Sequence, residues 1–283
     1  MGLKQLLHIG KRSAFHPFRE YRRMYFRFYH SKLEPHDIVC QTKDFSLKLC
    51  SDSVLAEPLF VGAGFEESEA ALLRHLARLG MKVIDVGANI GLYTVLLGNL
   101  VGKTGHVWSF EPFPPVVNYL KKNIELNKLT NITVIEMAVA EKEGVLDFHV
   151  FPEGCDVYNS LGAANRPTEQ LQAVQKIPVR VTTLDTIAYE VGITEIDLLK
   201  IDVEGAEERV LKGAEKIIRR NPNIKIIMEI YEPSAKQCGC SSDRMIEMLL
   251  EWGFSIFKIG PGGIQVRCSA DDFSGVYALF KRD

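Results

Sequence analysis

The chain has 283 residues, of which 46% are hydrophobic and 25% are charged. This composition is typical of a globular protein with one sizeable core, or of one domain with an appendage. The net charge is −2, which does not favour nucleic acid as a partner of the whole chain. The charge is uneven, because residues 1–32 carry eight Lys or Arg and a single acid, Glu20, and are therefore +7 against −9 for the remainder.

Targeting signals and cysteine spacing restrict the compartment. There is no secretory signal and no apolar run of 18 residues, so no membrane-spanning helix is expected. The six cysteines show neither a C-x-x-C pair nor a zinc-like spacing. We therefore expect a cytoplasmic protein with free thiols, whose oligomeric state the sequence does not indicate.

Residues 1–36 form a basic and aromatic arm for which a helix is predicted. At helical spacing the aromatic residues lie near one face and three arginines share another: Phe18, Tyr21, Tyr25, Phe28 and Tyr29, against Arg19, Arg23 and Arg27. One interpretation is an interfacial helix, which would place the protein peripherally at the inner face of a membrane. The other is a helix packed on the main domain, or a partner-binding arm with a solvated basic side. Amphipathicity alone does not choose between them.

Residues 37–63 are predicted to hold a small β-hairpin, from alternating runs at 38–40 and 45–49, and a linker. From residue 64 onward, apolar runs of strand length alternate with amphipathic stretches of helix length, the pattern of a mostly parallel sheet covered by helices. The predicted strands cover 83–86, 106–110, 132–136, 196–201, 225–229, 255–259 and 276–280, the last of them antiparallel. The predicted helices cover 65–79, 92–100, 112–127, 184–191, 204–220 and 243–252.

Two further alternating runs, 145–150 and 179–183, predict extra strands outside this rhythm. The polar stretch between them, 152–178, contains Gly and Pro and is read as an insertion. Loops of that length are more often functional than idle.

A glycine-rich turn follows the strand 83–86, and an acid ends the next strand. The turn carries Gly87, Asn89 and Gly91, and the acid is Glu111. Glycines let the backbone approach a ligand closely, and a carboxylate in this position accepts hydrogen bonds from ribose hydroxyls. Both features therefore indicate a ligand that contains adenosine.

The spacing of the turn distinguishes between adenosine ligands. The dinucleotide pattern G-x-G-x-x-G is not met, because Asn89 stands in place of the middle glycine and Gly91 comes one residue early. Asp85, inside the strand, could hold an ammonium group. A ligand with an adenosine end, an amino-acid end and no phosphate fits best, and S-adenosylmethionine is that ligand. The alternative is a tight turn without a ligand, in which Asp85 bonds local backbone.

Two sequence blocks resemble a known family. The blocks VIDVGANIGLYT at 83–94 and LKIDVEGAE at 199–207 look like the FkbM-type methyltransferases, which are class I enzymes that depend on S-adenosylmethionine. The resemblance covers roughly residues 64–260 and leaves out the basic arm. It implies a doubly wound, Rossmann-like, mostly parallel sheet of seven strands, and O-methylation of a hydroxyl, commonly on sugars or complex natural products. It does not identify the acceptor.

Three acids at neighbouring strand ends are the candidate catalytic residues. Asp202 ends the strand 196–201, Glu204 follows two residues later, and Glu229 ends the strand 225–229. The carboxyl ends of parallel strands face the ligand crevice, so these acids could bind the acceptor and take its proton. A divalent cation is an alternative, but no histidine or second acidic cluster completes its shell, and we do not favour it. A third interpretation has Asp202 orienting the methionine amine, Glu204 capping a helix and Glu229 structural.

Other candidates surround the cofactor. Glu136, Met137 and Ala138 leave the third strand where the adenine is expected, while Tyr93 and Pro112 flank the two ligand-binding turns. Asn159 and Ser160 of the insertion are expected to close over cofactor or acceptor. His149 is an alternative base, and Lys200 is read as a structural partner of nearby acids.

These observations predict three segments: an arm at 1–36, a hairpin and linker at 37–63, and a methyltransferase domain at 64–283. The predicted function is O-methylation of a saccharide, glycolipid or natural-product acceptor. One rival is a nucleotide-binding oxidoreductase, against which the glycine spacing argues. The other is a non-catalytic membrane- or partner-binding protein, against which the presence of Asp85, Glu111 and Asp202 argues.

Overall fold

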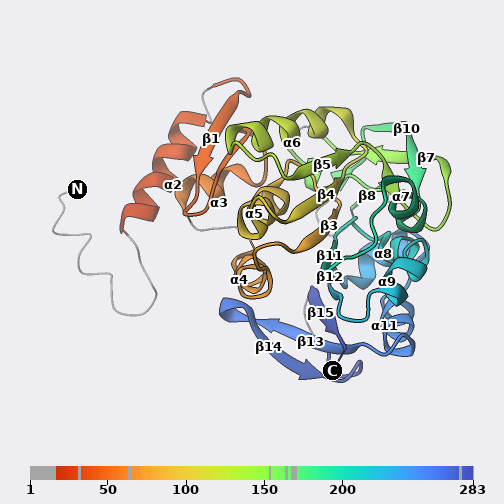
Figure 1. Cartoon of the computed structure of the whole chain (residues 1–283). Coiled ribbons are helices and arrows are strands. Elements are labelled where there is room, and N and C mark those ends of the chain that lie inside the picture. The colour runs from red at the N-terminus through yellow and green to blue at the C-terminus, as the bar shows by residue number, and fades with distance from the viewer. Residues whose placement is uncertain are drawn as a thin grey trace.

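The computed structural model describes residues 17–30, 33–62, 66–152, 154–162, 165–166, 171–273 and 276–282. Its centre is a sheet of eight strands in the order β14-β13-β15-β12-β11-β3-β4-β5 (Figure 1). The strands are β3 Lys82–Val86, β4 His106–Phe110, β5 Ile132–Ile135, β11 Leu198–Ile201, β12 Lys225–Glu229, β13 Ser255–Gly260, β14 Ile264–Cys268 and β15 Tyr277–Lys281. The five strands from β12 to β5 are parallel, and β15 is antiparallel to β12. The predicted α/β fold with a mostly parallel sheet and an antiparallel last strand is confirmed.

The sheet has one strand more than the predicted seven. The additional strand, β14, forms an antiparallel hairpin with β13 at the edge of the sheet. Its apolar residues Ile264 and Val266 are 62% and 52% exposed. The strand therefore lacks a buried face, and with it the apolar pattern from which strands are predicted. Two glycines with positive φ, Gly262 and Gly263, allow the chain to turn between the two strands.

Helices cover both faces of the sheet, as the continuous burial of its central strands requires. The elements are α4 Glu67–Leu76, α5 Leu92–Val101, α6 Pro114–Leu126, α7 Leu184–Val191, α8 Glu207–Lys212, α9 Glu215–Arg220, α10 Glu232–Gln237 and α11 Ser242–Glu251. Val83 packs in a core shared with α4, α5 and α6, whereas its neighbour Ile84 packs in a core shared with α7, α8, α9 and α11. Successive residues of the central strands thus anchor opposite layers.

The prediction of one continuous helix over 204–220 is wrong, because the chain forms two helices there, α8 and α9. The break lies at Gly213, where an added Cβ would come 2.0 Å from the carbonyl oxygen of Ala140. The backbone of the break thus packs directly against Ala140, which follows the short strand β6, Ala138–Val139.

A smaller sheet lies beside the main one. It consists of β6 Ala138–Val139, β10 Gln175–Thr182 and β7 Gly144–Val150, with β10 in the middle. The two extra strands predicted from the sequence are confirmed as β7 and β10. The insertion between them contains the 3-10 turn η1, Asp156–Tyr158, and the short strands β8 Asn165–Arg166 and β9 Leu171–Gln172.

The predicted hairpin is present as β1 Asp37–Gln41 and β2 Ser46–Cys50. Two side-chain amides hold β2, that of Asn123 in α6 and that of Asn127, the residue after the helix. Asn127 bonds both the N–H and the carbonyl of Ser46, at 2.9 and 2.7 Å, and Asn123 does the same for Lys48, at 2.6 and 2.9 Å. Leu47 and Leu49 are buried in the core that also contains α4 and α5. The hairpin therefore shares a core with the main sheet, and the domain limits drawn from the sequence stay a prediction.

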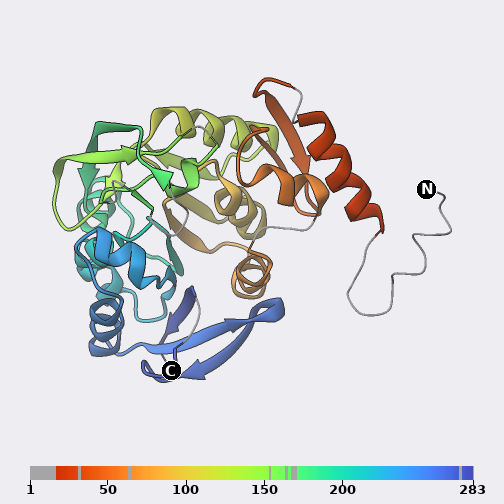
Figure 2. The ribbon, with the colours of Figure 1, turned by 180° about the vertical axis from the view of Figure 1, so that it is seen from behind.

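The helix described in the basic arm is α2, Pro17–His30, which packs on α3, Ala56–Val61, at the edge of the molecule (Figures 1 and 2). Phe26 is buried against Phe60, and Glu57 pairs with Arg27 at 3.0 Å. Among the described residues, no helix has both the length and the apolar character needed to cross a bilayer. A membrane contact of this arm stays a prediction, and residues 1–16 lie outside the described ranges.

The turn after β3 approaches the end of β11 closely. Gly87 has a φ of +81°, and an added Cβ would lie 1.7 Å from the carbonyl oxygen of Asp202. A side chain here would therefore be strained and would also force two strand ends apart. The glycine brings together the two loops on which most predicted site residues lie.

Gly87→Ala is expected to destabilise the fold much more than Gly192→Ala. Gly192 also has a positive φ, +75°, but an added Cβ there meets nothing within 4 Å. Gly192→Ala should cost about 1–2 kcal/mol, which is the strain alone. Gly87→Ala should cost more than about 3 kcal/mol, because backbone must move as well. Urea unfolding measures both, and equal costs would show that the close approach carries no energy.

Candidate active site

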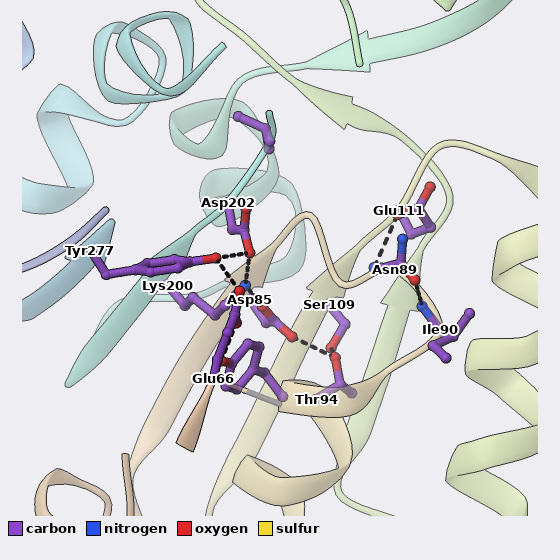
Figure 3. A network of polar contacts seen from close by, with 12 residues as sticks. Glu66, Asp85, Asn89, Ile90, Thr94, Ser109, Glu111, Lys200, Asp202 and Tyr277 are labelled. Atoms are coloured by element: carbon purple, nitrogen blue, oxygen red, sulfur yellow. Dashed lines mark hydrogen bonds and ion pairs between the residues drawn. The ribbon is translucent and has the colours of Figure 1, made fainter. Parts of the chain in front are cut away.

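A cavity of about 320 Å³ opens where the parallel strands end, a size within the range of small-molecule sites. It lies at the carboxyl ends of β3, β4, β11 and β12, where open α/β sheets bind ligands. The cavity brings together most of the residues predicted from the sequence: Gly87, Asn89, Tyr93, Glu111, Pro112, Met137, Ala138, Asn159, Asp202, Glu204 and Glu229. Its polar groups gather at two ends, one around Glu111 and one around Asp202 (Figure 3).

At the first end, the Glu111 carboxylate is held by the turn that follows β3. One oxygen accepts the N–H of Asn89 at 3.1 Å, and the other accepts the N–H of Phe113 at 3.0 Å. Glu111 is only 6% exposed, and burial raises its pKa to about 7, against the two backbone donors that lower it. Each oxygen has a further lone pair, so the carboxylate can accept two more hydrogen bonds from a ligand.

The neighbouring wall of the cavity is apolar, and one predicted acid is not part of it. Met137, Ala138 and Phe148 line this side, which suits a flat aromatic base. Glu136 does not line the cavity; its half-exposed side chain pairs with Lys121 on α6. This position does not support the predicted contact of Glu136 with the adenine. Glu136 and Met137 lie between β5, which ends at Ile135, and the next short strand, which begins at Ala138, and only Met137 of the two lines the cavity.

At the second end, Lys200 is buried between two carboxylates. Its ammonium nitrogen lies 3.0 Å from Asp202 Oδ2 and 3.7 Å from Asp85 Oδ1, and 4.6 Å from the centroid of the Tyr93 ring. Burial disfavours the charged form of Lys200, but Asp202 and Asp85 outweigh it and hold its pKa above the ordinary value. The predicted structural pairing of Lys200 is what the structure shows.

Asp85 belongs to this buried cluster rather than to the cavity wall. Its side chain is fully buried and accepts a hydrogen bond from Thr94 at 2.6 Å, and Thr94 in turn contacts Ser109 at 2.9 Å (Figure 3). Burial raises the pKa of Asp85, while Lys200 and Thr94 lower it. The ammonium group that faces Asp85 is therefore that of Lys200. The expectation that Asp85 holds the amine of the ligand does not match this position.

Two residues of this end were not singled out from the sequence, Glu66 and Tyr277. The Tyr277 hydroxyl lies 3.1 Å from Glu66 Oε1 and 2.9 Å from Asp202 Oδ2, and Tyr93 donates to the other oxygen of Glu66. Burial, and then the charge of Asp202, raise the pKa of Glu66 to about 7. Glu66 precedes α4 and Tyr277 begins β15, far from any motif. No spacing in the sequence links them, because only the sheet brings them together.

The remaining predicted acids also line the second end. Glu229 is 8% exposed at the end of β12, and Glu204 follows β11 with a φ of 59°. Glu204 does not cap the following helix: Glu207 accepts the N–H groups of Val203 and Gly205, at 3.0 and 3.1 Å. Within the described ranges, no three His, Cys, Asp or Glu side chains are arranged to hold a metal ion.

Backbone strain is concentrated at this cavity. In the part of the chain that the structure describes, the non-glycine residues with positive φ are Glu66, Asn89, Lys128 and Glu204. All but Lys128 line the cavity. A left-handed conformation costs such residues of order 1 kcal/mol each, and it persists only where surrounding structure enforces it. The concentration of strain marks the cavity as a functional site.

Three further candidates lie close by but outside the cavity wall. Gly91 begins α5 with a φ of +97°, and an added Cβ there would meet Leu120 at 2.7 Å, so it serves packing. Ser160 is buried and pairs through its backbone with His149. His149 itself does not line the cavity, which argues against it as a base.

Comparison with known proteins identifies a family and several relatives. A model of the methyltransferase FkbM domain matches residues 85–256. Methyltransferase sdnD of Sordaria araneosa is 28% identical, over 62% of this chain and 74% of its own. The 31-O-demethyl-FK506 methyltransferase FkbM of Streptomyces tacrolimicus is 30% identical, over 52% of this chain and 65% of its own. The 2-O-methyltransferase NoeI of Sinorhizobium fredii is 27% identical, over 49% of this chain and 59% of its own.

Lys200→Met is expected to destabilise the protein by about 3–5 kcal/mol at pH 7, because it leaves Asp85 buried without a counter-charge. The loss should shrink as the pH falls and Asp85 takes up a proton. The double variant Lys200→Met with Asp85→Asn should recover part of the stability, since it removes the uncompensated charge. Urea unfolding of the two variants at pH 5 and pH 8 measures this. If the double variant is no more stable than the single one, the ion pair is not what Asp85 requires.

Proposed function

The chain belongs to the FkbM family of methyltransferases, and we propose that it transfers the methyl group of S-adenosylmethionine to a hydroxyl of a saccharide, glycolipid or natural-product acceptor. The matched domain, residues 85–256, makes up more than half of the chain. The observation that carries the proposal is the cavity itself, which has a carboxylate at one end for a nucleoside and a group of carboxylates at the other for hydroxyls.

The first end of the cavity suits the adenosine part of the donor. Glu111 keeps a lone pair on each oxygen after accepting the N–H groups of Asn89 and Phe113, and neighbouring ribose hydroxyls are matched donors for them. Met137 and Ala138 offer the apolar surface that an adenine ring requires. Gly87, which has no side chain, lines the cavity and lets the methionine part approach the backbone.

The second end suits an uncharged acceptor rich in hydroxyl groups. Asp202, Glu204 and Glu229 line it, and in this part of the cavity the described positive charge is Lys200, already shared between Asp85 and Asp202. Carboxylates accept hydrogen bonds from hydroxyls and repel phosphate or carboxylate groups. We assign Asp202, Glu204 and Glu229 to binding and orienting the acceptor, so that its oxygen, the methyl carbon and the sulfur fall in line.

The rival functions fit less well. An oxidoreductase would need a turn that binds a pyrophosphate, and the Gly87–Gly91 turn lacks the middle glycine of that pattern. A binding protein without activity would not need the strained residues that line the cavity, which cost stability. The names of the 2-O-methyltransferase NoeI and the 31-O-demethyl-FK506 methyltransferase are in keeping with O-methylation.

Glu111→Gln is expected to weaken S-adenosylmethionine binding and to stabilise the protein without ligand. Binding should fall by about 1–3 kcal/mol, or about five- to 150-fold, because one acceptor for ribose is lost. The pKa of Glu111 is raised from 4.5 to about 7, so its contribution to stability is fully present below pH 4.5 and is lost as the pH rises through about 7. Removing the charge should therefore stabilise the free protein at pH 8 by up to about 3 kcal/mol, and not at pH 4.5.

Calorimetry of S-adenosylmethionine binding and urea unfolding at the two pH values test this. Glu136→Gln is the matched control, because Glu136 lies outside the cavity, and it should change neither quantity appreciably. Absence of S-adenosylmethionine binding by the wild-type protein would overturn the proposed function.

A further inference from the structure

We propose that Glu66 is the general base of the methyl transfer, and that Tyr277 connects it to Asp202 as a shared hydrogen-bond partner. The inference rests on the proposed function and extends it to two residues outside the matched domain of 85–256. Both residues line the cavity at its acceptor end (Figure 3).

The position of Tyr277 indicates that one of the two carboxylates can carry a proton. Its hydroxyl lies 3.1 Å from Glu66 Oε1 and 2.9 Å from Asp202 Oδ2, but a hydroxyl has a single proton to donate. Two ionised carboxylates would compete for that proton and repel each other. If Glu66 is protonated, it donates to the Tyr277 oxygen while Tyr277 donates to Asp202, and every group is satisfied.

The counter-charges decide which carboxylate takes the proton. Asp202 has the Lys200 ammonium 3.0 Å away as its counter-charge. In the described ranges Glu66 makes no ion pair, and its direct partners are the neutral hydroxyls of Tyr93 and Tyr277. We therefore assign the proton to Glu66, the carboxylate without an ion-pair partner in the described ranges.

The groups around Glu66 bring its pKa close to neutral pH. The groups that face it are Tyr93 on α5, Tyr277 on β15, and Lys200 and Asp202 on and after β11; Glu229 at the end of β12 and Glu69 on α4 act on those tyrosines. Burial, and then Asp202, raise the pKa of Glu66 to about 7, which is where a general base is most effective. Its φ of 48° holds the side chain in this place at a cost in strain.

The step is a proton transfer coupled to a displacement. The O–H bond of the acceptor breaks, and its proton goes to a Glu66 oxygen. The electron pair left on the acceptor oxygen forms the bond to the methyl carbon. The bond from methyl carbon to sulfur breaks with its electron pair on sulfur, so the sulfonium becomes the thioether of S-adenosylhomocysteine. Glu66 later returns the proton to water.

The test compares Glu66→Gln with Glu69→Gln. Glu69 lies in the first turn of α4, the helix that follows Glu66, and also has a pKa raised by burial, but it does not line the cavity. The donor is S-adenosylmethionine with a ¹⁴C-labelled methyl group, and the acceptors are a panel of methyl pyranosides, from which one methylated by the wild type is used. Glu66→Gln should lower kcat about 10²- to 10⁴-fold with S-adenosylmethionine binding changed less than about threefold. Glu69→Gln should match the wild type.

The pH profile separates a base from a structural residue. Wild-type kcat should rise with pH to a plateau, with an apparent pKa of about 7, and Glu66→Gln should lose that rise. Tyr277→Phe removes the hydroxyl that Glu66 and Asp202 share, so the rise of kcat in this variant should shift away from the wild-type pH. If Glu66→Gln does not fold, Glu66→Asp replaces it in the test. This variant should keep the rise of kcat with pH, at a lower kcat than the wild type.

The outcomes distinguish the two levels of the proposal. A Glu66 variant that keeps wild-type kcat and its pH dependence overturns the assignment of the base, and so does one that loses donor binding while keeping kcat. A wild-type protein that binds S-adenosylmethionine but methylates no pyranoside overturns the saccharide acceptor and, with it, this inference. A wild-type protein that does not bind the donor overturns the proposed function as a whole.

Discussion

The architecture of the cavity depends on one buried charge, the ammonium group of Lys200. An ammonium taken out of water is costly unless carboxylates surround it closely. Here they come from its own chain two residues later, Asp202, and from the adjacent strand β3, Asp85. Satisfying the charge therefore requires the ends of β3 and β11 to stay in register, and Gly87 makes the approach of their loops sterically possible.

The two ends of the cavity differ chemically because their carboxylates are held by different kinds of hydrogen-bond donor. Glu111 is fixed by backbone N–H groups of the turns that follow β3 and β4, so its orientation follows directly from the fold of the parallel sheet. Glu66 is fixed by tyrosine hydroxyls, which can both donate and accept. The first arrangement suits a permanent binding group, and the second suits a group that changes its protonation state.

This arrangement costs stability at neutral pH. Burial raises the pKa of Glu66, Glu111 and Glu207 to about 7, and each such shift means that the folded protein tolerates the charged form less well than the unfolded chain does. Three of the strained backbone positions lie on the same cavity. The large apolar layers on both faces of the sheet offset these costs. A site that combines strain and raised pKa values is what catalysis requires of a fold that is otherwise regular.

The sequence by itself determined the structural features that depend only on residues close together in the chain. Periodicity predicted the seven alternating strands, because strands buried on both faces read as apolar runs. The glycine turn and Glu111 could be placed, since each follows its strand directly. The edge strand β14 and the break at Gly213 were not predicted, because the strand is largely exposed and the break depends on contact with Ala140.

Only the tertiary structure decided which charges meet. Asp85 was expected to bind a ligand amine, but it pairs with the ammonium group of Lys200 on the adjacent strand. Glu136 was expected at the adenine, but it pairs with Lys121 on α6. Glu66 and Tyr277 lie 211 positions apart and are joined by a hydrogen bond. A pairing of this kind follows from the order of strands in the sheet, and no local pattern of residues encodes it.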